Sequence, residues 1–132
     1  MLRFTLKAQA LFYVATGAWP LIDIDSFLAA TGPKEDIWLV HTVGALLALI
    51  GGVLYIGALQ KRLHAETLAL AFGTAIALIA IDVIYVQRGV IAPIYLADAL
   101  VESMVAAALL IGWRVYDREP TPRLVAPRQR RA

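Results

Sequence analysis

Three apolar stretches of more than 20 residues constrain what this chain can fold into. They cover about residues 36–60, 65–86 and 93–113. An α-helix rises 1.5 Å per residue, so about 20 residues cross the ~30 Å hydrocarbon core of a bilayer. Hydrophobic residues make up 61% of the chain, whereas a soluble domain is about half apolar. The sequence therefore predicts an all-α, polytopic membrane protein.

A shorter apolar stretch at about residues 4–20 completes a predicted four-transmembrane-helix bundle over residues 1–116. It spans the membrane only if its helix bends at Pro20 and continues through residues 21–30; alternatively, residues 21–30 lie along the interface. A cleaved signal peptide is another alternative for residues 1–20, although no A-x-A-like cleavage site follows. Residues 117–132 are basic and contain prolines, and we expect them to form a disordered cytoplasmic tail.

Lysine and arginine are distributed unevenly along the chain. Ten of the twelve lie near the amino terminus, between the second and third stretches, or near the carboxyl terminus: Arg3, Lys7, Lys61, Arg62, Arg114, Arg118, Arg123, Arg128, Arg130 and Arg131. Only Lys34 and Arg88 fall on the other side of the predicted topology. Because cytoplasmic loops have the excess of positive charge, we expect a multi-pass protein of the inner (plasma) membrane with both termini in the cytoplasm.

Three carboxylic acids interrupt the apolar stretches, namely Asp82, Asp98 and Glu102. A charged side chain at the bilayer centre costs about 2.5–3.5 kcal/mol on insertion scales, so the acids should face protein. The helical rise places them and His41 about 8–14 Å from the outer ends of their helices. Asp98 and Glu102 are four residues apart and share one helix face. The pattern predicts a polar pocket in the outer half of the bilayer.

Groups close to these acids complete the predicted pocket. The candidate pocket or ion-binding residues are His41, Thr42, Asp82, Tyr85, Tyr95, Asp98 and Glu102. His41 should face protein, because small residues on its helix, Gly44, Ala48 and Gly52, let a neighbouring helix approach closely. Like charges at this spacing cannot all ionise cheaply, so we expect at least one acid to be protonated at neutral pH. Such a state suits proton handling.

Three functions fit this pattern. The favoured one is binding or translocation of a small cationic or protonatable solute. In the first alternative, the chain is a structural or assembly subunit whose buried acids only hold helices together. In the second, it is an intramembrane acid–base enzyme, and His41 and one acid shuttle protons on a lipophilic substrate.

The sequence points to few other ligands or partners. It contains no cysteine, and no histidine spacing typical of a metal site, so we expect no metal and no cofactor. No catalytic residue is identified. The lipid bilayer is the expected partner, with a small cation or a lipophilic molecule as ligand, and the pattern is compatible with a homo-oligomer. Nucleic-acid binding is not expected, because the basic tail lacks interleaved aromatic residues.

Two segments also suggest a relationship. TGPKEDIWLVHTVG at residues 31–44 and DVIYVQRGVIAPIYLADALVE at residues 82–102 resemble a family of small bacterial four-helix membrane proteins of unassigned function. The architecture and the APIY run are more loosely similar to the emopamil-binding and sigma-2-receptor superfamily. That similarity implies four or five membrane helices around an internal pocket for lipophilic amines or sterols. Neither resemblance implies a catalytic residue in this chain.

Overall fold

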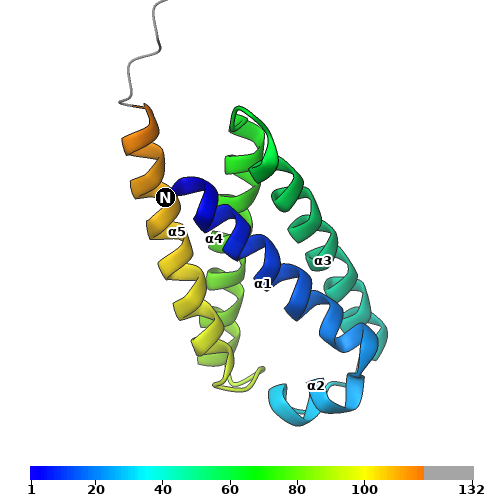
Figure 1. Ribbon diagram of the computed structural model, residues 1–132. Helices are drawn as coiled ribbons and strands as arrows, with labels where there is room; N and C mark the ends of the chain where they lie inside the picture. The colour runs from blue at the N-terminus through cyan, green and yellow to red at the C-terminus, as the bar shows by residue number, and fades with distance from the viewer. Residues whose placement is uncertain (118–132) are drawn as a thin grey trace, which may run out of the picture.

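The computed structural model describes residues 1–117, and their regular structure is entirely helical. Five helices follow one another in place of the four expected: α1 Leu2–Ile22, α2 Ile24–Thr31, α3 Ile37–Leu59, α4 Ala65–Gln87 and α5 Tyr95–Asp117 (Figure 1). α3, α4 and α5 are each long and apolar enough to cross a membrane. This confirms an all-helical chain and indicates a membrane protein. The predicted disordered tail falls on residues 118–132, which lie outside the described part.

The additional helix arises from a helix boundary at Asp23. α1 runs through Pro20 and ends at Ile22, and Asp23 then has φ −144° and ψ 86°, which is not helical. The Asp23 carboxylate accepts a hydrogen bond of 3.1 Å from the backbone N–H of Ser26. This bond satisfies one of the free N–H groups at the start of α2 and so caps the new helix. The segment expected to continue the first span therefore forms a separate helix of eight residues.

Two helix pairs organise the bundle. α1 packs along most of α3, α4 packs along α5, and α1 also contacts α5. Glycines allow the first pair to approach closely, because a Cβ atom at Gly17 would lie 2.5 Å from the carbonyl oxygen of Gly44. A Cβ atom at Gly51 would lie 2.6 Å from the carbonyl oxygen of Ala10, whereas one at Gly52 would meet nothing within 4 Å. The contact stripe of α3 therefore includes Gly44, as expected, but continues through Gly51 instead of Gly52.

The core lies where α1 meets the other helices. Its buried apolar side chains come from four helices: Leu2, Leu6, Ala10, Tyr13, Leu54, Ala58, Leu68, Ala71 and Leu109. Outside this core, the long helices expose many large apolar side chains, for example Leu49 at 65% and Leu100 at 63%. Helices that are apolar on all sides are typical of a hydrocarbon environment.

The amino terminus, residues 60–64 and the last turns of α5 lie together and form what we name the basic end. The Arg3 guanidinium donates hydrogen bonds to the carbonyl oxygens of Ala58 at 2.9 Å, of Gln60, and of Lys61 at 2.7 Å. Leu2 packs against Gly112, since a Cβ atom there would lie 3.1 Å from Leu2 Cδ1. Residues 23–36 and 88–94 form the opposite end, which is at the bottom of Figure 1.

Candidate functional site

Polar side chains occupy core positions on three helices. The buried stripe of α1 recurs every three or four residues: Leu2, Leu6, Gln9, Tyr13, Gly17 and Pro20. Asp82 belongs to the buried stripe of α4, and Glu102 lies on the buried face of α5. Gln9, Tyr13, Asp82 and Glu102 are each at most 4% exposed. Large apolar residues usually fill such positions, so this polar group requires a separate explanation.

Hydrogen bonds connect these side chains across three helices. The Tyr13 hydroxyl donates to Glu102 Oε2 at 2.9 Å, which joins α1 to α5. Gln9 Nε2 donates to the Tyr13 hydroxyl at 2.9 Å and to the backbone carbonyl of Ala71 in α4, also at 2.9 Å. We call Gln9, Tyr13, Asp82, Asp98 and Glu102 the polar cluster.

Asp82 and Asp98 bring two carboxyl groups together inside the bundle. Asp98 lies in the first turn of α5, one helical turn before Glu102, and it is half-buried. Its carboxyl group lies close enough to that of Asp82 on α4 for the two charges to repel each other. Its place near the positive end of the α5 dipole favours a negative charge there. The structure therefore gathers the three acids identified in the sequence between α4 and α5, on the side facing α1.

Three buried oxygen atoms in the polar cluster have no hydrogen-bond partner within residues 1–117. They are Gln9 Oε1, Asp82 Oδ2 and Glu102 Oε1. Most buried polar atoms in proteins are paired, and leaving one unpaired costs about 1–3 kcal/mol. All three can accept a hydrogen bond or coordinate a cation. The cluster is therefore rich in acceptors and short of donors.

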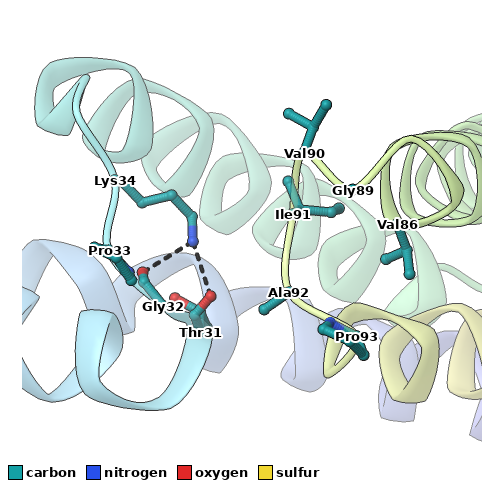
Figure 2. Close-up of a pocket in the computed structure, with 10 residues that line it drawn as sticks. All are labelled: Thr31, Gly32, Pro33, Lys34, Val86, Gly89, Val90, Ile91, Ala92 and Pro93. Atoms are coloured by element: carbon teal, nitrogen blue, oxygen red, sulfur yellow. Dashed lines mark hydrogen bonds between the residues drawn. The ribbon is translucent and has the colours of Figure 1, made fainter.

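A cavity of about 430 Å³ opens at the opposite end, next to the polar cluster. Residues 31–34 line one side, and Val86 together with residues 89–93 line the other (Figure 2). Val86 lies one helical turn beyond Asp82 on α4, and Pro93 precedes the first turn of α5. The cavity lining thus comes within one to two helical turns of Asp82 along α4 and of Asp98 along α5.

Lys34 contributes the only charged side chain to the lining of this cavity. Its ammonium group donates to the carbonyl oxygens of Thr31 at 2.9 Å and Gly32 at 3.0 Å, as Figure 2 shows. It also lies 5.3 Å from the centre of the Tyr95 ring, a cation–π distance. Removal from water lowers the pKa of Lys34 from its ordinary value of 10.5. The ammonium group is held by two carbonyl oxygens and an aromatic face.

The remaining candidate residues, Thr42, Tyr85, His41 and Tyr95, have other surroundings or partners than the hydrogen bonds of the polar cluster. Thr42 is exposed, and its hydroxyl donates to the carbonyl of Trp38 one turn back on α3 at 2.8 Å. Tyr85 is 40% exposed and faces Arg88, whose guanidinium carbon is 5.8 Å from the ring centre. His41 is half-buried on α3, and within residues 1–117 it forms no hydrogen bond or ion pair with an acid. Tyr95 lies under the ammonium group of Lys34 and begins α5, three residues before Asp98.

Gln9 and Tyr13 are the cluster residues that the sequence interpretation missed. Their spacing could have indicated a polar face on the first helix, because residues four apart lie on the same side of a helix. Gln9 is also an uncharged polar residue within a mostly apolar segment. The α4 partner of Gln9 lies 62 residues away along the chain, and the α5 partner of Tyr13 lies 89 residues away.

The described residues contain no group of three or more His, Asp or Glu side chains placed to hold one metal ion. Comparisons of the chain with protein-family models, with curated proteins and with solved structures found no match. The suggested relationship to small four-helix membrane proteins therefore stays a prediction, and any function for the polar cluster has to be argued from its own geometry.

Proposed function

We propose that this protein binds a small cationic or protonatable solute in the polar cluster and conducts it across the membrane. The observation that supports this most is the excess of buried acceptors. Gln9 Oε1, Asp82 Oδ2 and Glu102 Oε1 lack donors within the described residues, so a cation or an N–H or O–H donor would recover the free energy lost by burying them.

The acid pair supports a solute with positive charge or a mobile proton. Two carboxyl groups this close in a low dielectric cannot both ionise cheaply. In our proposal Asp82 and Asp98 therefore share one proton in the resting state, and an arriving cation takes its place. Intramembrane acids that face the interior of a bundle often mark ion or proton pathways.

The cavity at the opposite end supplies a route to the cluster. Its volume of about 430 Å³ suits a small molecule, and Val86 at its wall is one turn from Asp82. Lys34 lines this cavity and contacts the ring of Tyr95, which is three residues before Asp98 on α5. In our proposal the Lys34 side chain moves aside when the solute enters.

The proposed membrane arrangement has four spans, α1, α3, α4 and α5, with α2 along the outer interface. α1 lacks the length of apolar sequence that the other three have, but its polar residues Gln9 and Tyr13 are buried against neighbouring helices. The cytoplasmic side would hold the basic end, because Arg3, Lys61 and Arg62 gather there. This orientation puts the cavity and the acids in the outer half of the inner membrane.

A specific observation also favours the structural alternative. The bonds from Tyr13 to Glu102 and from Gln9 to the Ala71 carbonyl tie α1, α4 and α5 together, as a register-fixing network would. The two readings differ in the unpaired oxygens, which a purely structural network has no reason to keep. No observation favours acid–base catalysis through His41, because within the described residues no hydrogen bond joins His41 to an acid.

Glu102→Gln is the variant that separates the two readings. Gln keeps the shape of the side chain and an oxygen that accepts from Tyr13, but it removes the negative charge and the titration. The experiment measures uptake of radiolabelled methylammonium and of protons into vesicles that contain the purified protein. We expect the variant to fold with unchanged thermal stability and its flux to fall to that of protein-free vesicles.

The matched control is Asp25→Asn, which removes an acid from the exposed helix α2 and should leave the flux unchanged. Transport through the cluster is refuted if Glu102→Gln conducts like the unmodified protein. If the unmodified protein neither binds nor conducts either probe, while Glu102→Gln is fully stable, the structural reading replaces the proposal.

A further inference from the structure

A second cavity lies towards the basic end, between α4 and α5, and none of its lining residues belongs to the polar cluster. Its volume is about 370 Å³, and it is lined by Ala65, Leu68, Ala69, Phe72, Leu109, Leu110 and Trp113. All seven lining residues are apolar or aromatic, and the small residues Ala65 and Ala69 leave the space open. Both helices are long enough to span the membrane. We call this cavity the α4–α5 groove.

Exposed cations surround the end of the groove. Lys61 and Arg62 precede Ala65 by four and three residues, and Arg114 follows Trp113 directly. All three side chains are exposed. Glu66 is an exposed carboxylate at the same rim, and the three cations outnumber it.

The backbone adds positive potential at the same place. α4 begins at Ala65, and its N-cap residue His64 forms no side-chain capping bond. The positive end of the α4 macrodipole therefore faces the rim. Trp113 lies at the same level, where tryptophan side chains typically mark the boundary between hydrocarbon and headgroups.

We propose that the α4–α5 groove binds one acyl chain of an anionic phospholipid, whose phosphate lies among Lys61, Arg62 and Arg114. The reasoning combines shape and charge. An apolar groove that faces hydrocarbon accepts a lipid tail at no desolvation cost, but it does not discriminate between lipids. The cations select the anionic headgroup, since each one near the surface favours an anionic lipid by about fivefold.

Quenching of Trp113 fluorescence by lipids with brominated acyl chains tests this directly. The chain has three tryptophans, and the other two, Trp19 and Trp38, belong to the opposite half. The variant Trp19→Phe/Trp38→Phe leaves Trp113 as the only reporter. Reconstitution into phosphatidylcholine vesicles with the same small fraction of brominated phosphatidylglycerol or brominated phosphatidylcholine gives the relative affinity, whichever way the protein inserts.

We expect brominated phosphatidylglycerol to quench Trp113 at a several-fold lower mole fraction than brominated phosphatidylcholine does. Removing the three cations with Lys61→Gln/Arg62→Gln/Arg114→Gln should abolish this preference. The matched control Lys34→Gln/Arg88→Gln removes two cations at the opposite end and should keep it. Inorganic phosphate in millimolar excess should not compete, because the acyl chain contributes to binding.

Ala69→Leu distinguishes specific binding in the α4–α5 groove from non-specific electrostatic attraction to a charged surface. It fills the groove and leaves every cation in place, so it should remove most of the preference for phosphatidylglycerol. Three results would overturn the proposal. They are equal quenching by both lipids when the three cations are present, a preference for phosphatidylglycerol that survives removal of the three cations, and a preference that Ala69→Leu leaves unchanged. None depends on whether the polar cluster conducts a solute.

Discussion

Asp23 shows how one exposed carboxylate sets a boundary between two helices. Its hydrogen bonds from Ser26, the backbone N–H first, lower the pKa of Asp23 below its ordinary value of 3.8. A carboxylate with a lowered pKa in the folded state stabilises that state above the unfolded pKa, and this contribution disappears as the pH falls through the folded pKa. α2 should therefore be held to α1 at neutral pH and loosen in acid.

Hydrogen exchange of residues 24–31, corrected for the intrinsic pH dependence of exchange, measures this effect. Protection should be constant from neutral pH down to about pH 4 and then fall. Asp23→Asn keeps a capping oxygen without a titrating group, so its protection should no longer depend on pH in this range. Asp25→Asn is the control and should behave like the unmodified chain. Acid loss of protection that persists in Asp23→Asn would assign the effect to another group.

For the acids, the sequence predicts burial but not the bonding partner. The cost of charge in hydrocarbon was enough to predict that Asp82 and Glu102 face protein, and both are buried. The partner of Glu102 could not be read in this way, because Tyr13 reaches it only when α1 and α5 have one particular rotation and offset. Whether His41 meets an acid could not be read either, since depth along a helix does not fix which neighbour the side chain meets.

At the scale of helices, the α1–α3 contact depends on the absence of side chains at Gly17, Gly44 and Gly51. Gly51→Ala would place a Cβ atom 2.6 Å from the carbonyl oxygen of Ala10 and 2.9 Å from Val14 Cγ2. The backbone of α1 cannot yield without losing its own packing, so we expect a loss of about 1–3 kcal/mol in the free energy of unfolding.

The adjacent residue provides the matched control for this prediction. A Cβ atom at Gly52 meets nothing within 4 Å, and alanine is the better helix former, so Gly52→Ala should be neutral or should stabilise by up to about 1 kcal/mol. Chemical unfolding in detergent, followed by circular dichroism, compares the two variants. Equal stability of Gly51→Ala and Gly52→Ala would show that the close α1–α3 contact is not formed.

The helices themselves were more predictable than their ends. The three long apolar stretches correspond to α3, α4 and α5 within a few residues, because hydrophobic length is a property of each segment alone. The sequence did not predict α2 as a separate helix, since its boundary depends on a single capping bond at Asp23 and not on hydrophobicity. The contact stripe of α3 through Gly51 could not be predicted from α3 alone, because it depends on how α1 packs against that helix.

At the scale of the whole molecule, the membrane topology can be tested by cysteine labelling. The chain contains no cysteine, so each introduced cysteine is a unique labelling site. We expect a cysteine introduced by Glu35→Cys to react with a membrane-impermeant maleimide added outside intact cells. A cysteine introduced by Gln60→Cys should react only after the membrane is permeabilised. Glu35 and Gln60 are both exposed, so a difference between them reports the side of the membrane. The reverse labelling pattern would invert the orientation and move the acids to the inner half.

The polar partners of α1 also have a consequence for how the protein is made. α1 is synthesised before its polar partners, which are the carbonyls of Ala58, Gln60, Lys61 and Ala71 and the carboxyl group of Glu102. In the proposed membrane arrangement, the hydroxyl of Tyr13 would lack its acceptor in the bilayer until translation has passed residue 102, at a cost of several kcal/mol. α1 would thus be made before the other four helices but become stable in the membrane only after α5 is present.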